Sequence, residues 1–399
     1  MTQPTAVQTA AIIGGGIAGA AAALALAKAG ITPVVYEAYA GTAEGVGVFL
    51  TVATNGIDAL RVLDAAGPVL DMGFPTPAIT LRSGTGKRLG ATPTGYPLSD
   101  GTVSHTITRA DLYNGLQELV RDRGIRVEHS KRLVDAIDTG HGVRADFADG
   151  TTASADLLVG CDGVHSTVRK LIDSRAPAPH FEGLVTTGGY ATGVAAGIPG
   201  DGYEMIFGKR AFFGYAADSD GQVWWFANLP WQPEPPHTEL RAITQDERRR
   251  LLLEAFADDA GPACALIDAA KEIGPFSAIH TLPRLGSWHR GRMIVIGDAA
   301  HAPSPTSGQG ASLSVEDAVQ LALCLRDVPE PDPALSRFEA LRRPRVEPIV
   351  RWAARFNSSK AAGPVGRVIR DAMLPAALRM AAGSKAQRQI FNYHLDWQG

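Results

Sequence analysis

Residues 7–37 read VQTAAIIGGGIAGAAAALALAKAGITPVVYE, and this stretch decides the fold. An apolar run leads into glycines, then into an alanine-rich helical pattern, then into a second apolar run that ends on Glu37. The order predicts a strand, a tight turn, a helix and a second strand. Gly14 permits the turn, Gly16 lets a pyrophosphate approach the backbone, and Gly19 lets the helix pack close to the sheet.

The acid at the end of the second run supports a nucleotide site. Glu37 lies 18 residues after Gly19, close to the spacing of about 20 that brings a carboxylate to the ribose hydroxyls in a nucleotide-binding βαβ unit. The alternative is an ordinary glycine-rich turn between core elements. Because strand, helix and acid are all in register, the nucleotide site is favoured.

Composition excludes several other classes. A chain of 399 residues exceeds one typical core, and its 45% hydrophobic and 20% charged content indicates a globular protein. A net charge of -3 gives no reason to expect nucleic acid, so a small-molecule partner is favoured. Three scattered cysteines indicate neither a disulfide framework nor a metal site and fit a reducing cytoplasm. The uncharged run 10–27 is not expected to span a membrane, since it is rich in glycine and alanine and the nucleotide turn explains it.

Two later apolar runs end in similar polar turns. Residues 157–160 lead into Asp162-Gly163, and residues 293–296 lead into Gly297-Asp298. Open α/β sheets bind ligands at the carboxyl ends of their strands. A loop over 303–312 and a helix over 313–325 follow the second turn, so backbone amides there are expected to stabilise an electron-rich group that gains negative charge.

Arg109 stands in the first turn of a helix that Thr108 is expected to cap. A cation there opposes the helix dipole, which an anionic ligand would explain. A solvated surface arginine explains it equally well.

Residues 176–282 have the strand-like pattern of an antiparallel sheet, with a dense set of aromatic residues. Period-two alternation puts Phe213 and Tyr215 on one face and Phe212 on the other, but it does not say which face looks toward a ligand. Arg210, in a turn of this sheet, is of a kind usually solvated.

The glycine turn, Asp162-Gly163 and Gly297-Asp298 together resemble, in kind and order, the motifs of the class A flavoprotein monooxygenases. This family includes para-hydroxybenzoate, salicylate and urate hydroxylases and tetracycline-modifying enzymes. The resemblance implies FAD as cofactor and NADH or NADPH as a transient reductant. The cofactor-binding residues that it implies are Gly14, Gly16, Ala18, Gly19, Glu37 at the ribose, Arg109 at the pyrophosphate, Val134 at the adenine, Asp162, Asp298 at the ribityl chain, and Gly308, Gly310 and Ala311 at the flavin ring.

The resemblance also implies an α/β fold with a Rossmann-like FAD-binding domain, an inserted antiparallel-sheet substrate domain and C-terminal helices. The expected FAD-binding domain comprises residues 1–74, 101–175 and 283–330, the substrate domain 75–100 and 176–282, and the C-terminal helices 331–399. The substrate is expected between the flavin and the inserted sheet, near Arg210, Phe213, Tyr215, Trp225 and Pro305.

The implied activity is insertion of one oxygen atom from O2 into an electron-rich aromatic or polyunsaturated small molecule through a flavin hydroperoxide. No catalytic base is assigned, and His301 is expected to be structural. A flavin halogenase is disfavoured, since residues 225–230, Trp-Phe-Ala-Asn-Leu-Pro, lack its second tryptophan and its isoleucine. A flavin reductase or saturase that does not use oxygen stays open, as does a non-catalytic flavin-binding partner protein. We expect a monomer or weak dimer without a metal.

Overall fold

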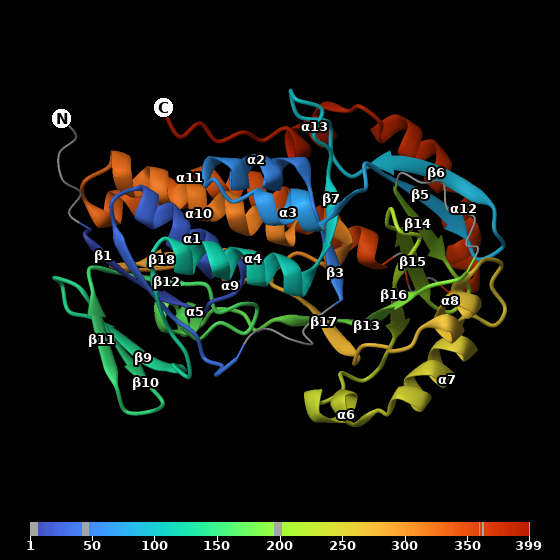
Figure 1. Cartoon of the computed structure of the whole chain (residues 1–399), viewed down its shortest axis with the longest axis horizontal. Helices are drawn as coiled ribbons and strands as arrows, with labels where there is room; N and C mark the ends of the chain where they lie inside the picture. The colour runs from blue at the N-terminus through green and yellow to red at the C-terminus, as the bar shows by residue number, and fades with distance from the viewer. Residues whose placement is uncertain (1–6, 42–47, 195–201, 359, 361–362, 399) are drawn as a thin grey trace.

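The computed structural model describes residues 7–41, 48–194, 202–358, 360 and 363–398. Figure 1 shows two lobes. One holds a sheet beneath long helices, and the other holds a second, larger sheet.

The first lobe is built on the predicted strand, turn, helix and strand. These elements are β1 (Thr9–Ile13), α1 (Ile17–Lys28) and β2 (Thr32–Tyr36), and β1 pairs in parallel with β2. Four more strands complete a sheet of order β18-β19-β12-β1-β2-β8, namely β8 (Arg126–Glu128), β12 (Leu157–Gly160), β18 (His289–Arg290) and β19 (Met293–Val295). Since β12 and β19 pair beside β1, the chain leaves this sheet and returns to it. The carboxyl ends of β1, β12 and β19 therefore meet at one edge.

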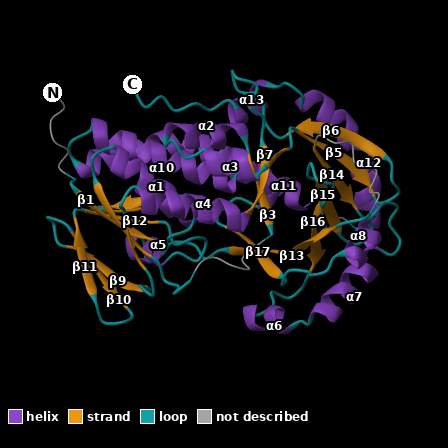
Figure 2. Ribbon diagram, viewed as in Figure 1, coloured by secondary structure: helices purple, strands orange, loops and turns teal. Residues whose placement is uncertain are grey.

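Long helices cover this sheet, and α1 packs against both α10 and α4 (Figure 2). The helices of this lobe are α2 (Thr54–Val62), α3 (Gly67–Met72), α4 (Arg109–Asp122), α5 (Thr167–Ile172), α9 (Asp298–His301), α10 (Gly310–Asp327) and α11 (Pro331–Ser358). A small antiparallel sheet, β9 (Leu133–Asp138), β10 (Val143–Phe147) and β11 (Thr152–Ala155), lies below them. A further sheet, β3 (Phe49–Val52), β7 (His105–Thr108) and β4 (Phe74–Pro75), lies between the lobes.

The second lobe is a seven-stranded sheet of order β17-β13-β16-β15-β14-β5-β6. Its pairs are antiparallel except for β14 with β5. The strands are β5 (Ala78–Ser83), β6 (Arg88–Pro93), β13 (His180–Ala191), β14 (Gly202–Phe207), β15 (Phe212–Ala217), β16 (Val223–Pro230) and β17 (Ser277–Thr281). An α/β fold with an added antiparallel sheet was predicted, and that fold class is confirmed.

The two faces of this sheet have different covers. Helices α6 (His237–Ala242), α7 (Gln245–Phe256) and α8 (Ala263–Ala269) supply apolar side chains to the core on one face. Phe49 and Phe74, of the sheet between the lobes, cover the other together with α12 (Pro364–Ala381). The last helix is α13 (Lys385–Phe391). Within the described part of the chain, no helix is both long and apolar enough to cross a bilayer.

Candidate active site

The turn after β1 brings together three glycines that meet different steric demands. Gly14 has a φ of +99°, and a Cβ there would lie 2.6 Å from the Cys161 carbonyl oxygen. A Cβ at Gly19 would overlap the Gly14 carbonyl oxygen. At Gly16, by contrast, no atom lies within 4 Å of the position of a Cβ. Packing therefore requires two of the glycines, and the third leaves its backbone open to a phosphate.

Glu37 closes this turn from the end of β2. Its carboxylate accepts hydrogen bonds from the backbone N–H groups of Gly15 at 2.7 Å and Tyr39 at 2.9 Å. Gln117, on α4, donates to the Gly15 carbonyl oxygen at 2.6 Å. The carboxylate is thus fixed beside the amino end of α1, where its remaining lone pairs can accept from ribose hydroxyls.

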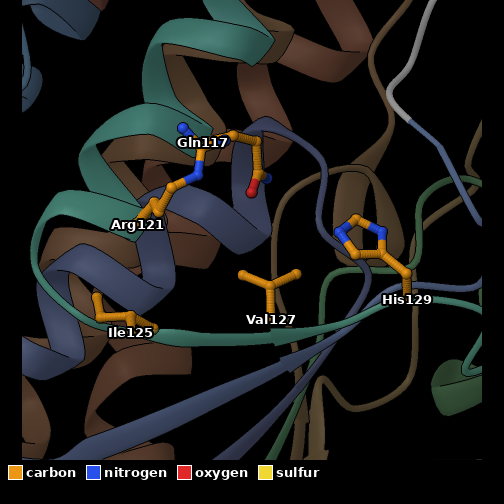
Figure 3. Close-up of a pocket in the computed structure, with 5 residues that line it drawn as sticks. All are labelled: Gln117, Arg121, Ile125, Val127 and His129. Atoms are coloured by element: carbon orange, nitrogen blue, oxygen red, sulfur yellow. The ribbon is translucent and has the colours of Figure 1, made fainter.

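A cavity of about 240 Å³ adjoins this turn (Figure 3). Besides being bonded to Gly15, Gln117 lines the cavity, and His129, another lining residue, has a ring nitrogen 3.3 Å from the Tyr39 carbonyl oxygen. The other lining residues are Arg121, Ile125 and Val127. The cavity therefore belongs to the Glu37 end of the site and not to the end at Asp298.

The Gly297-Asp298 turn lies against α1 and α10. Gly297 has a φ of +58°, and a Cβ there would lie 2.8 Å from the Ser314 Oγ and 3.1 Å from the Ala18 Cβ. Asp298 carries exposed surface, yet burial raises its pKa, while His301 and Arg109 lower it. The exposed surface of Asp298, at the turn after β19, leaves its carboxylate accessible to a ligand. Arg109 is exposed and close enough to act on Asp298 electrostatically.

The loop after Asp298 leads into the amino end of a long helix. A 3₁₀ turn (Pro305–Ser307) is followed by Gly308, with a φ of +59°, and α10 begins at Gly310, three residues before the predicted start at Leu313. A Cβ at Gly310 would lie 3.9 Å from Asp298 Oδ1. The N–H groups of the first helical turn have no partner within the helix, and the dipole makes that end positive. Gly310 and Ala311 can therefore hold an electron-rich group beside Asp298.

Asp162 has a different environment from the one expected. Its carboxylate accepts from the Ser166 hydroxyl at 2.5 Å and from the N–H groups of Thr167 and Val168 at 2.7 and 3.1 Å, at the start of α5. Burial raises its pKa, and these hydrogen bonds oppose the rise. The carboxylate therefore serves the start of α5, and a contact between this turn and the cofactor stays a prediction.

Arg169 joins the two Asp-containing turns. It is 2% exposed and donates to the carbonyl oxygens of Val164 at 2.7 Å and Ala299 at 3.1 Å. Its role in the structure is therefore to hold the segment after Asp162 against α9.

A buried ion cluster, which the sequence does not predict, lies behind the segment 297–309. We use this name for Glu316, Asp317, Arg342, Arg345 and His301. Arg342 donates to Asp317 at 2.6 Å and to Glu316 at 2.8 Å, and all three side chains have no exposed surface. Arg345 donates to Glu316 at 2.8 Å. The cluster anchors α11 to α10.

The same cluster fixes both ends of the segment 297–309. Asp317 Oδ2 accepts from the Gly297 N–H at 2.9 Å and lies 2.5 Å from His301 Nε2. Asn55 donates to Glu316 at 2.6 Å and to Gln309 at 2.9 Å. Burial raises the pKa of Asp317, but His301 and Arg342 lower it more, so that it falls to about 2. In this arrangement His301 is a partner of a buried carboxylate, which matches the structural role expected for it.

The aromatic residues of β15 and β16 divide between the two sheet faces. Phe213, Tyr215 and Trp225 are at most 4% exposed and lie in the core with α7 and α8. The Phe213 ring stacks on Trp225 with centroids 5.6 Å apart and meets Phe256 of α7 edge-on at 5.2 Å. The expectation that these three side chains line the substrate site is therefore corrected, because helices cover their face of the sheet.

The opposite face borders the first lobe. Phe226 lies 5.9 Å from Phe49, and Trp224 lies 5.7 Å from Phe49 and 5.0 Å from Phe74, centroid to centroid. Phe226 and Phe49 keep accessible surface, although both lie between the lobes. This face therefore has surface available to a ligand between the lobes.

Three other predicted site residues lie apart from one another: Arg210, Pro305 and Val134. Arg210 is exposed and donates to Asp258 at 2.7 Å and to the Glu254 carbonyl oxygen at 2.5 Å, at the carboxyl end of α7. This corrects its expected place near a substrate, because α7 covers the other face of the sheet.

Pro305 is exposed in the loop before Gly310. Val134, on β9, is 52% exposed, three residues after Lys131, whose N–H donates to the Glu37 carbonyl oxygen at 2.8 Å.

Comparison with known proteins decides the family. A sequence model described as FAD binding domain matches residues 6–353. A 3-amino-4-hydroxybenzoate 2-monooxygenase of Streptomyces platensis is 33% identical over 93% of each chain. An FAD-dependent urate hydroxylase of Klebsiella pneumoniae is 30% identical over 85% of this chain and 87% of its own. The chain belongs to the class A flavoprotein monooxygenases.

Solved structures agree with this assignment. Klebsiella pneumoniae HpxO, crystallised with FAD and uric acid, superposes with a TM-score of 0.82 at 26% identity, over 96% of each chain. The tetracycline destructase Tet(55) superposes with a TM-score of 0.71 at 19% identity and supports the fold alone.

FAD is the cofactor of this monooxygenase, and NAD(P)H is the reductant typical of its family. The residues present fit FAD, because Gly16 leaves room for a phosphate, Glu37 is held beside the turn, and Asp298 and Gly310 lie together at the opposite end. Among the described residues, no group of three or more His, Cys, Asp or Glu side chains is arranged to hold a metal.

Proposed function

We propose that this monooxygenase consumes NAD(P)H and inserts one oxygen atom from O2 into an electron-rich aromatic or polyunsaturated small molecule. Bound FAD would supply the redox chemistry, taking a hydride from NAD(P)H and activating O2 once reduced. Glu37 would bind the adenosine ribose, Gly16 the pyrophosphate and Asp298 the ribityl chain. Gly310 and Ala311 would stabilise negative charge on the reduced ring.

One observation carries the proposal. Asp298 keeps exposed surface beside Gly310, and Phe49 and Phe226 keep accessible surface where their rings meet between the lobes. Tyr190, half-buried on the same sheet face, donates to the Val48 carbonyl oxygen at 3.1 Å. A substrate held here would contact apolar aromatic surface on one side and the flavin on the other, in a space poor in water.

The relatives support the substrate class. Urate and 3-amino-4-hydroxybenzoate, in the names of two of them, are aromatic, and zeaxanthin, in the name of an epoxidase 29% identical to this chain, is polyunsaturated. We further propose a monomer or weak dimer in the cytoplasm, consistent with the free thiols of Cys161, Cys264 and Cys324.

The test is the stoichiometry of the purified holoenzyme. Oxygen and NAD(P)H consumption and product mass are measured with a panel of hydroxylated aromatics and polyenes, with catalase present to detect released peroxide. One O2 consumed per NAD(P)H, with product heavier by one oxygen atom, supports the proposal. A reduced product without oxygen uptake would establish the reductase or saturase instead. No turnover with any member of the panel, despite bound FAD, would favour a non-catalytic flavin-binding protein.

A further inference from the structure

A lysine is buried on the sheet face that borders the first lobe. Lys360 is 5% exposed, donates a hydrogen bond to Asn228 Oδ1 at 2.7 Å, and lies 4.3 Å from the centroid of the Phe212 ring. Asn228, 2% exposed, donates in turn to the Thr186 hydroxyl at 2.9 Å. Among the described residues, no carboxylate forms an ion pair with Lys360.

This environment disfavours a permanent charge on Lys360. An ammonium group without a counter-ion is costly in the protein interior, so burial favours the neutral amine form of the side chain. Burial alone lowers the pKa of Lys360, to about 7. The Phe207 ring, which adjoins Phe212, carries Arg370, and Arg370 pairs with Asp371. Neither residue is a cause of the shift in the pKa of Lys360. Near neutral pH, Lys360 can therefore take up a proton.

A row of aromatic rings links Lys360 to the flavin side of the site. Ring centroids of Phe212 and Phe226 are 6.1 Å apart, and those of Phe226 and Phe49 are 5.9 Å apart. Val48, next to Phe49, accepts a hydrogen bond from the Arg109 N–H at 3.2 Å. Phe49, Phe226 and Thr186 all keep accessible surface. A planar molecule lying on Phe226 would have the cofactor residues at one end and the Thr186, Asn228 and Lys360 group at the other.

We propose that Lys360 anchors the substrate by taking the proton of an acidic hydroxyl group on an aromatic ring. The inference rests on the proposed function and names the group that the substrate must carry. The O–H bond breaks with its electron pair left on oxygen, and the proton bonds to the lone pair of Nζ. The resulting ammonium and phenolate compensate each other's charge in the buried site. The phenolate ring is also richer in electrons than the phenol, and so reacts more readily with an electrophilic oxygen.

The test uses the oxidised holoenzyme and two probes. The first is 4-nitrophenol, whose anion absorbs at longer wavelength than its neutral form, and the second is 4-nitroanisole, which has no proton to lose. Difference spectra report both affinity and ionisation across pH. We expect the parent to hold 4-nitrophenol as the anion below the pH at which the free phenol ionises. Lys360→Met should weaken 4-nitrophenol binding by about tenfold or more, since a hydrogen bond to a charged group is lost. Binding of 4-nitroanisole should change less than twofold.

Two further variants complete the design. Lys360→Arg keeps its cation at every pH of the titration, so its affinity for 4-nitrophenol should rise to a plateau above the pH at which the free phenol ionises. The affinity of the parent should instead fall there, as Lys360 loses its proton. Lys385→Met, at an exposed lysine of α13, should behave as the parent. FAD content and melting temperature identify a variant that fails to fold, and the arginine variant then decides.

Three results would overturn the proposal: an unchanged bound anion in Lys360→Met, equal losses for both probes, or no binding of 4-nitrophenol to the parent. Neither NAD(P)H nor O2 takes part in these measurements. A failed oxygen stoichiometry would therefore refute the proposed function and leave this result standing.

Discussion

Replacing Asp317 by Asn tests whether the ion cluster holds the segment 297–309 in place. The Asp317 carboxylate accepts hydrogen bonds from Gly297, His301 and Arg342 and has no exposed surface. An amide would leave Arg342, which has no exposed surface, sharing one carboxylate, Glu316, with Arg345. Removing one partner of a buried ion pair costs about 3–5 kcal/mol. We expect the lower end, about 3 kcal/mol, because the amide oxygen still accepts one hydrogen bond.

This cost converts into a measurable shift in melting temperature. For 399 residues, an unfolding entropy of about 2.1 cal/mol/K per residue gives about 0.8 kcal/mol/K, so that 3 kcal/mol lowers the melting temperature by about 4 °C. Scanning calorimetry on parent and variant measures it. The matched control is Asp327→Asn at the end of the same helix, where the carboxylate is 38% exposed and pairs with Arg326. There we expect less than about 0.5 kcal/mol.

The difference between Asp317→Asn and the parent should also depend on pH. The pKa of Asp317 falls from 3.8 to about 2 on folding. Its stabilisation is therefore present above about pH 4 and is lost as the pH falls from about 4 toward 2. The two melting temperatures should converge in that range. Equal losses for Asp317→Asn and Asp327→Asn at neutral pH would refute this account of the cluster.

Three further predictions follow from the site. Glu37→Ala should weaken FAD binding by about 1.5–3 kcal/mol, since a charged hydrogen-bond acceptor is lost; unchanged affinity in a fluorescence titration would place the ribose elsewhere. Gly16→Val should reduce FAD affinity and leave the melting temperature of the FAD-free protein unchanged. Gly19→Val should lower that melting temperature, because of these two glycines only Gly19 lacks room for a side chain. Phe226→Ala should raise the KM for substrate or uncouple NAD(P)H oxidation from oxygenation. Phe213→Ala should instead lower the free energy of unfolding by about 3–5 kcal/mol. The reverse pattern in kinetics and calorimetry would contradict the assigned faces of the sheet.

The sequence predicts the cofactor end of the fold well, because local rules determine it. The strand, turn and helix at residues 9–28 depend on glycine sterics and on apolar periodicity, both visible in a short stretch. The strands that precede Asp162 and Asp298 are likewise short buried runs. Since parallel strands place their carboxyl ends at one edge, the joint position of these turns also follows from the sequence.

The ion cluster could not be predicted in the same way, because its partners lie on different helices. Arg342 stands 25 residues after Asp317 and on a helix with two internal prolines. One local signal existed: Glu316 and Asp317 are the only charged residues of the helix between residues 310 and 325, and from Ser312 to Leu325 the helix is buried on every side. Adjacent carboxylates there require cationic partners from elsewhere in the fold.

The sequence does not predict which face of the inserted sheet meets a ligand. Alternation assigns residues to the two faces, but both faces here carry aromatic side chains. What distinguishes them is the cover that each receives. The face with Phe213 meets α7 and α8, which follow soon after in the chain, so their apolar side chains complete a core without any ligand. The face with Phe226 meets β3, from the sheet between the lobes, and Lys360, from beyond α11. A surface assembled from such distant segments can change at the substrate without changing the cofactor end, which is how one fold can serve relatives named for urate and for zeaxanthin.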